Sequence, residues 1–339
     1  MSRTRLGGVK VIENRAWLNS VCRTGGDPLA SICSTFAAGR INLGMLTHVA
    51  DNGCGQSITA ASAKNASCFS GYMIEAVDSG NCREAEVEDD AARVSVFPHG
   101  QRPEIAASVI SLLGGGAIKP YGLASSPSAM TIVVSSSDFE AAMERIFASF
   151  DFTACASYDE WRALCRMDEQ QLSVVRFSYD EQVITTYGFM RQAGLDLWSC
   201  SLPVEEIDRF GSFLYELGEL RSKLPFLIST TALTEEIVYF SFALGVELRE
   251  KASQMLEKHL SRSDGCRTGP VSVIFVHGPH FGDRYGIARA FTSALREGGV
   301  SILALSCAVS SISAVIAGSD PDRAVECLKT RFQTPAVQD

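Results

Sequence analysis

The alternation of apolar and polar positions is clearest near the C-terminal end of the chain, between residues 271 and 332. The apolar run 271–276 predicts a strand, and a glycine-marked loop follows it from 277 to 286. Ile287–Glu297 predicts an amphipathic helix that stops at a pair of glycines. Two more strands and a closing helix are expected at 300–307, 310–317 and 320–332. The stretch therefore predicts one compact unit with the order βαββα.

Three earlier stretches have a similar order and begin near residues 9, 93 and 172. In the first, Asp27 and Pro28 begin a helix that runs to about residue 38, because Asp is a favoured N-cap and Pro fits the first helical position. In the second, a helix at 104–113 ends at three consecutive glycines. A polar, partly acidic segment at 78–90 between these two stretches predicts a solvated linker.

The third stretch fits the order less regularly. We expect a strand at 172–177, a helix at 181–192 that ends at Gly194, and a strand at 195–202. The pattern then predicts an extra helical segment at 205–223 and an additional strand at 226–231. The closing strand and helix follow at 237–244 and 247–260.

The βαββα order is that of a ferredoxin-like βαββαβ unit without a clear final strand, which we expect in the linkers or exchanged between units. Spacings of roughly 80 to 100 residues suit compact domains better than solenoid repeats. The expected fold is α+β, with antiparallel sheets and four such units at 1–85, 91–152, 168–262 and 268–334.

Composition narrows the classes of partner. The formal net charge of −9 and the lack of a basic cluster argue against nucleic acid. No segment reaches the roughly 18 consecutive apolar residues of a membrane-spanning helix, and no signal peptide is evident. The 11 cysteines are scattered without a C-x-x-C pair, which argues against a zinc ribbon and a disulfide framework. We therefore expect a cytoplasmic protein with reduced cysteines.

Two loops carry a family resemblance. The last stretch contains Gly278-Pro-His-Phe281, then Gly286-Ile-Ala288, and later an Ile-Ser-Ala-Val-Ile strand. The second stretch contains Arg102-Pro-Glu-Ile-Ala106. These segments resemble the ACT domains that regulate aspartokinases, and the likeness covers about a third to a half of the chain. The other two stretches match in architecture only.

The sequence departs from that family at positions that matter. Glu104 stands for the family's glycine, Gln101 for its aspartate, Ser126 for its asparagine and Phe281 for its methionine. The aspartokinase start K-x-G-G-[ST] and a P-loop are both absent from the sequence. The resemblance therefore implies a regulator without a kinase domain, with no cofactor, no metal and no catalytic residue.

The resemblance also implies where a ligand would bind. The loop after the first strand leads into a helix N-terminus, which favours a carboxylate, while the second strand of a paired unit would accept from an ammonium group. The expected ligand-binding residues of the second stretch are Gln101, Arg102, Glu104, Ser125 and Ser126. Those of the fourth are Gly278, His280, Asp283, Arg284, Ser301 and Ser306.

Three functions remain open at this point. The first is a regulatory module that binds an amino acid or similar small polar effector between units and acts on a partner enzyme or its own homo-oligomer. The second is a structural interaction module whose ligand sites have decayed, which the departures favour. The third is an enzyme at the loop that holds His277, His280 and Asp283, with His99 in the matching loop; surface imidazoles are the plainer reading of these residues.

Overall fold

The computed structural model describes residues 3–22, 27–50, 56–63, 82–114, 118–169, 184–232, 236–260, 265–279, 281, 284–318 and 321–334. The closing helix of the first stretch, which the βαββα order and the sequence place at 64–76, and the strand expected at 172–177 both lie outside these ranges.

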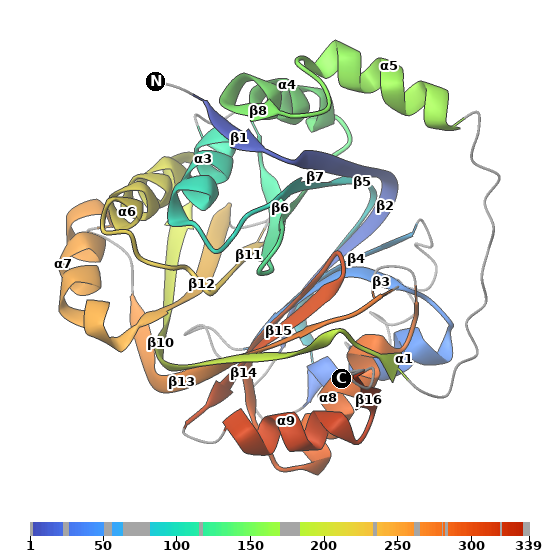
Figure 1. The fold of residues 1–339 in the computed structure, drawn as a ribbon, viewed down its shortest axis with the longest axis vertical. Helices are drawn as coiled ribbons and strands as arrows, with labels where there is room; N and C mark the ends of the chain where they lie inside the picture. Colours follow the sequence, from blue (N-terminus) through green and yellow to red (C-terminus); the bar gives the residue numbers. More distant parts are fainter. Residues whose placement is uncertain are drawn as a thin grey trace, which may run out of the picture.

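The main described elements form four runs with the order strand, helix, strand, strand (Figure 1). The first run contains β2 (Gly8–Cys22), α1 (Pro28–Ala38), β3 (Leu43–Val49) and β4 (Gln56–Ala63). The second contains β5 (Cys82–Phe97), α3 (Pro103–Leu113), β6 (Pro120–Ser125) and β7 (Met130–Ser135), followed by α4 (Phe139–Ser149). The third contains β10 (Gly188–Pro203), α6 (Ile207–Glu219), β11 (Phe226–Ala232) and β12 (Ile237–Gly245), followed by α7 (Arg249–His259). The fourth contains β13 (Cys266–His277), α8 (Ile287–Glu297), β14 (Ile302–Ala308) and β15 (Ser311–Ala317), followed by α9 (Pro321–Lys329).

Short elements lie between and beside these runs. Single-turn 3₁₀ helices at Val204–Glu206 and Val246–Leu248 precede α6 and α7. A further helix, α5 (Tyr158–Glu169), follows the second run and packs on α4 through Trp161 and Tyr158. The short strands are β1 (Thr4–Leu6), β8 (Phe150–Phe152), β9 (Ile184–Thr185) and β16 (Phe332–Gln333). No described helix is both long enough and apolar enough to cross a membrane.

The predicted start of the first helix is confirmed. Asp27 is the N-cap of α1, and its carboxylate accepts a hydrogen bond of 2.9 Å from the Ala30 amide. Pro28 occupies the first helical position, where its missing N–H costs no helical hydrogen bond. The sequence therefore determines this helix boundary locally.

The prediction for the third run is wrong in its described part. Residues 188–192 belong to β10 and not to a helix. Gly194 has a φ of 71°, and the register between β10 and β13 shifts between Gln192 and Leu195. The glycine therefore marks a bulge in one long strand, where the sequence pattern indicated a helix end. Consequently α6 is the regular helix of this run and β11 its regular second strand, so neither is an insertion.

The sequence predicts the segment 78–90 to be a polar linker with a short strand near Val87. In its described part it is strand throughout, because β5 begins at Cys82. Its first half pairs with β2, and Glu84, Glu86 and Glu88 lie opposite residues of that strand. The backbone is therefore in the sheet, although the side chains of Glu88, Asp89 and Asp90 are exposed as the acidic run predicted.

Twelve of the described strands form one closed sheet in the order β10-β12-β11-β6-β7-β5-β2-β4-β3-β14-β15-β13. All neighbours in it are antiparallel, as the sequence predicted. The edge-to-edge pairing expected between units is observed between runs: β3 pairs with β14, and β6 pairs with β11. The long strand β2 pairs with β5, which joins the first run to the second. Likewise β10 pairs with β13, which joins the third run to the fourth.

The final strands that the sequence did not reveal form two small parallel sheets. β8 follows α4 and pairs with β1, while β16 follows α9 and pairs with β9. The final strand of the second run therefore pairs with a strand that precedes the first run. In the same way, the final strand of the fourth run pairs with a strand that precedes the third. The first two runs and the last two runs repeat this arrangement, so the described chain has two similar halves.

The core has three apolar layers. One outer layer packs α3, α4, α6 and α7 against the second and third runs, and another packs α1, α8 and α9 against the first and fourth (Figure 1). Between the two faces of the sheet, Val49 and Ala304 pack with Phe226 and Ile228. The closed sheet is therefore a flattened sandwich with helices outside.

Two helix pairs lie over the edges where runs meet, and we name them the α3–α6 interface and the α1–α8 interface. At the first, a Cβ on Gly211 would lie 2.6 Å from Ser111 Oγ, and one on Gly218 would lie 3.2 Å from Glu104 Oε2. Larger residues at these glycines would force the helices apart. At the second, Arg296 of α8 lies 3.5 Å from Asp27 at the start of α1.

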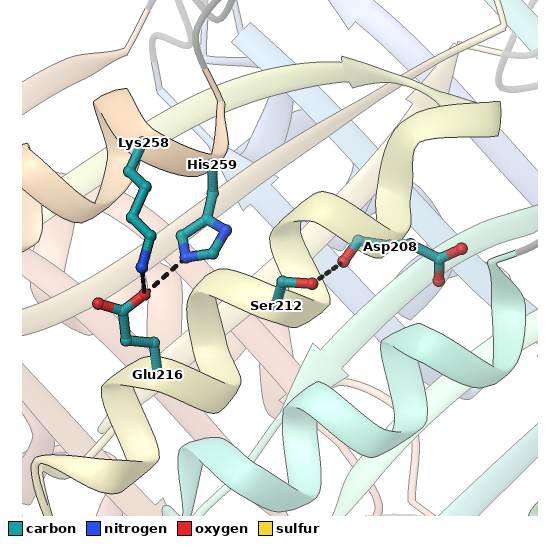
Figure 2. A network of polar contacts seen from close by, with 5 residues as sticks. All are labelled: Asp208, Ser212, Glu216, Lys258 and His259. Carbon is teal, nitrogen blue, oxygen red and sulfur yellow. Dashed lines mark hydrogen bonds and ion pairs between the residues drawn. The ribbon is translucent and has the colours of Figure 1, made fainter.

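A polar clasp joins α6 to α7, shown in Figure 2. Glu216 Oε2 accepts hydrogen bonds of 2.7 Å from Lys258 Nζ and 2.7 Å from His259 Nε2. These donors favour the ionised carboxylate and lower the pKa of Glu216. Ser212, one turn before Glu216, donates to the Asp208 carbonyl at 3.0 Å instead and takes no part in the clasp.

We expect Glu216→Gln to reduce stability modestly at neutral pH and to lose part of the wild-type pH dependence. A lowered folded-state pKa gives stability that is present above the ordinary carboxyl pKa and lost as the pH falls through the folded value. The pair is partly exposed, so the difference at pH 7 should be below about 1 kcal/mol. Urea unfolding at pH 7 and pH 3 measures it. The prediction is contradicted if the stability difference between the two proteins is the same at both pH values.

Candidate functional site

The α3–α6 interface holds the candidate residues of the second run, but its polar groups are engaged within the protein. The Gln101 carbonyl accepts a hydrogen bond of 2.9 Å from the amide of Leu224, which follows α6. Arg102 is the N-cap residue of α3 without a side-chain capping bond, and its guanidinium lies 3.9 Å from Glu104. Glu104 lies in the first turn of α3, where its negative charge already complements the helix dipole.

The predicted serines of this run are buried and take part in hydrogen bonds that stabilise the fold. Ser125 Oγ accepts from the Leu227 amide at 2.8 Å, so it fixes the β6–β11 pairing. Ser126 Oγ bonds both to the amide and to the carbonyl of Ala129, which closes the β6–β7 turn. Neither hydroxyl is exposed to a ligand from solvent, since both residues are at most 2% exposed. The prediction that they bind a ligand stays untested.

His99 lies behind these residues and is fully buried. Its Nδ1 lies 3.3 Å from the Ser126 carbonyl, while its Nε2 has no hydrogen-bond partner among the described residues. Burial lowers the pKa of His99 to about 4, because the charged imidazolium would be poorly solvated there. His99 is therefore a neutral, buried side chain rather than a surface imidazole.

Ser306 and Ser125, predicted from different runs, meet across the middle of the sandwich. Ser306 Oγ donates a hydrogen bond of 2.7 Å to the Ser125 carbonyl. The contact joins β14 to β6, which belong to opposite faces of the closed sheet. Ser306 points away from the α1–α8 interface and does not contribute to a site there. Ser301 is exposed, and its backbone carbonyl accepts a hydrogen bond of 3.4 Å from the Ala317 amide.

We expect Ser306→Ala to destabilise the protein by about 1 kcal/mol, the typical value for one buried hydrogen bond. Chemical denaturation at pH 7 measures the loss. Ser301→Ala is the matched control, because its exposed hydroxyl makes no such contact, and it should change stability by less than about 0.5 kcal/mol. Equal losses for the two variants would contradict the assigned role of Ser306.

The α1–α8 interface contains a small cavity of about 20 Å³, room for about one water molecule. Its floor is apolar, with Phe36, Leu43 and Ile287. Asn42 and Arg284 supply polar groups, and Cys33 and Cys307 line it too. Burial raises the pKa of both thiols to about 12, so they are protonated at neutral pH and unreactive.

The start of α8 faces this cavity. Gly286, with a left-handed φ of 85°, is the N-cap residue, and as a glycine it has no side chain to cap the helix. No acidic residue lies in its first turn, so the positive end of the helix dipole is not complemented there. This is the helix start that the sequence predicted as a carboxylate site. Of its predicted residues, Arg284 lines the cavity, whereas His280 and Asp283 lie outside the described residues.

A groove of about 400 Å³ adjoins the cavity on the outer surface. Gly286, Arg289 and Ala37 line both spaces, and Tyr285, Ser293, Glu297 and Arg331 line the groove alone. Arg331 forms an ion pair of 3.1 Å with Glu297. Sequence reasoning missed Asn42, Arg289 and Arg331. Asn42 reaches the site only through the pairing of the first run with the fourth, and Arg289 and Arg331 meet only when the fourth run folds.

The loop of the alternative enzymatic site is only partly described. His277 Nδ1 lies 3.0 Å from Ser311 Oγ and 3.2 Å from Ser310 Oγ, and its ring packs on Tyr187 with centroids 5.1 Å apart. Within the described part of the chain no carboxylate orients this imidazole, and no three His, Cys, Asp or Glu side chains group as metal ligands. Gly278 is buried in this loop, and a Cβ there would lie 2.3 Å from the Phe281 ring.

Comparison with known proteins identifies the fold. No family model and no curated protein sequence matches the chain. Its structure resembles the aspartate kinase from Synechocystis, with a TM-score of 0.76 and 13% identity over 97% of this chain. It also matches the regulatory subunit of aspartate kinase from Thermus thermophilus over 43% of this chain and 99% of that one, with 17% identity and a TM-score of 0.38.

The structural neighbours are thus aspartate kinases and their regulatory subunits, as the loop motifs predicted. The chain spans 56% of the length of the Synechocystis enzyme that it matches. At this identity the likeness establishes the mixed α/β fold alone. It gives no support to the expectation that a kinase domain is lacking.

Proposed function

We propose that the protein is a regulatory module that binds an amino acid or a similar small polar effector at the α1–α8 interface. Each run corresponds to one ACT-like unit in this proposal. The expected paired arrangement then forms within one polypeptide, through β3 with β14 and β6 with β11. Binding would be passed on to a partner enzyme or to a second copy of the chain.

The observation that carries the proposal is the difference between the two interfaces. At the α1–α8 interface, a cavity and a groove open beside an uncapped helix start. At the α3–α6 interface, the Gln101 carbonyl and the Ser125 hydroxyl are bonded within the protein, and Glu104 occupies the first helical turn. Because the cavity holds only about one water, α1 and the start of α8 must separate to admit a charged group of an effector.

Thermal unfolding in the presence of each of the common amino acids at millimolar concentration tests the proposal. A ligand at 100 times its dissociation constant stabilises the folded state by about 2.7 kcal/mol, which raises the melting temperature by several degrees. Ala37→Trp should abolish the shift, because Ala37 lines both the cavity and the groove. Ser108→Trp is the matched control, a half-buried position on α3 at the other interface. Absence of any shift contradicts the proposal.

A structural interaction module is the second candidate. The engaged polar groups of Gln101, Ser125 and Ser126 favour it, since they leave the second run without an open ligand site. It predicts a protein partner whose affinity does not change when small effectors are added. Binding of such a partner to the Ala37→Trp variant with unchanged affinity would separate this function from ligand sensing.

A further inference from the structure

Around the α1–α8 interface, positively charged side chains outnumber negatively charged ones among the described residues. Among the described residues that line the cavity and the groove, the charged ones are Arg284, Arg289 and Arg331 and one carboxylate, Glu297. In a chain of net charge −9, such a surplus of arginine on one concave surface is unusual. The trough beside the α3–α6 interface has the opposite balance, with Arg3 against Glu104 and Glu219.

Several donors in the groove are not engaged by the described protein. The side chains of Arg289, Tyr285 and Ser293 make no hydrogen bond or ion pair with any described residue. Arg331 is bonded to both carboxylate oxygens of Glu297, at 3.2 and 3.1 Å, which holds its guanidinium at the wall of the groove. The groove therefore offers positioned donors and no unpaired carboxylate from the described residues.

Gly286, Arg289 and Ala37 line both the cavity and the groove, so the two spaces adjoin and a ligand bound in both would contact these residues. An anionic group in the cavity would lie at the start of α8, beside Arg284. A second anionic group would extend into the groove toward Arg289 and Arg331, whose guanidinium groups bind carboxylate and phosphate through paired donors. A cationic side chain in the same position would meet like charge.

Resting on the function proposed above, we propose that the effector of the α1–α8 interface is a small dianion, a dicarboxylate or a phosphate ester. A neutral amino acid has only one anionic group, its carboxylate, which would use only the helix start. The second anionic group gives the selectivity, because it is the part of the ligand that the arginines of the groove contact.

Isothermal titration of the full chain with matched pairs of ligands tests this inference. The pairs are L-aspartate with L-asparagine and L-glutamate with L-glutamine, which differ by one charge at nearly constant shape. Succinate and O-phospho-L-serine distinguish a dicarboxylate source from a phosphate source, and L-lysine is the cationic comparison. The acid of a pair should bind at least about tenfold more tightly than its amide, as expected for a charged hydrogen-bonding group.

Variants assign the preference to the groove. Arg289→Gln and Arg331→Gln should each reduce the ratio of acid to amide affinity by about tenfold. Arg296→Gln is the matched control, since it lies on the same helix, lines neither space and pairs with Asp27 at 3.5 Å. Circular dichroism confirms that each variant is folded before titration.

The outcomes separate the two proposals. If amides or lysine bind as tightly as the acids, the dianion inference is overturned while the regulatory function stands. An equal loss in Arg296→Gln also overturns it, because the effect is then one of overall charge. If succinate or phosphoserine binds and no common amino acid does, the dianion inference stands and the effector is not an amino acid. Binding of none of these probes overturns the dianion inference, and the regulatory function is overturned as well only if the thermal screen of the common amino acids shows no shift.

Discussion

Asp196→Ala is expected to lower the free energy of unfolding by about 3 kcal/mol, because it leaves two arginines without their buried partner. Asp196 lies on β10 and is fully buried. Its carboxylate accepts hydrogen bonds of 2.7 and 3.0 Å from Arg249 at the start of α7, and Arg267 of β13 lies 3.3 Å away. The loss should fall short of that for a completely buried group, since the two arginine side chains are 45% and 37% exposed.

The position of Asp196 explains why one carboxylate matters this much. The register of β10 with β13 shifts between Leu195 and Leu197, where β10 passes from one face of the sandwich to the other. A Cβ on Gly269 would lie 2.0 Å from Asp196 Oδ1. The neighbouring strand β13 therefore leaves room for the carboxylate only because residue 269 is a glycine. The ion pairs of Asp196 with the two arginines therefore stabilise the junction between β10 of the third run and β13 of the fourth.

Asp322→Ala is the matched control for this prediction. Asp322 of α9 pairs with Arg191 on the same strand β10, but the two side chains are 69% and 51% exposed. An exposed pair contributes at most about 1 kcal/mol, so this variant should be nearly as stable as the wild type. Guanidinium unfolding at pH 7 measures the free energy of unfolding of both variants. Similar small losses in the two would show that the buried carboxylate does not stabilise the fold.

Lowering the pH from 7.5 to 4 is expected to cost the wild-type protein about 3 kcal/mol through His99 alone. The folded-state pKa of about 4 is below the ordinary histidine value of 6.5, so the unfolded chain binds more protons between these two values. Stability therefore falls as the pH decreases through this window, at up to 1.4 kcal/mol per pH unit. Above pH 7 the same group should contribute no pH dependence.

His99→Gln removes this titration. The glutamine amide can still donate to the Ser126 carbonyl, the contact that His99 Nδ1 makes at 3.3 Å. The variant should be less stable than the wild type at pH 7.5, and its disadvantage should shrink or reverse by pH 4. Urea midpoints measured across this range provide the comparison. Parallel pH profiles for the two proteins would rule out a buried neutral imidazole at this position.

Local sequence signals predicted much of the secondary structure, for identifiable reasons. Asp27 and Pro28 define the start of α1, and a glycine pair ends α8, because capping acts over a few residues. The same local reading failed at Gly194, since a glycine with positive φ fits a helix end and a strand bulge equally well. Only the pairing of β10 with β13 and β12 distinguishes the two.

The candidate site was predicted less completely than the fold. The loop resemblance led to Arg284 and to the start of α8, which do face the cavity. It also led to Ser125 and Ser306, whose hydroxyls are bonded inside the sandwich: that of Ser125 accepts from the Leu227 amide, and that of Ser306 donates to the Ser125 carbonyl. Arg331 was missed, although it lies beside Glu297 across the groove, because these residues are separated by two strands and a helix in the sequence.

The sequence by itself determined the βαββ order of the first, second and fourth runs, the start of α1 and the end of α8, and the resemblance of two loops to regulatory domains of aspartokinases. It did so because apolar periodicity and capping depend on near neighbours. The tertiary structure alone decided that the first run pairs with the fourth and the second with the third. Periodicity shows which face of an element is buried and not what covers it. The polar residues that close one interface and leave the other open could therefore be identified only after those pairings were known.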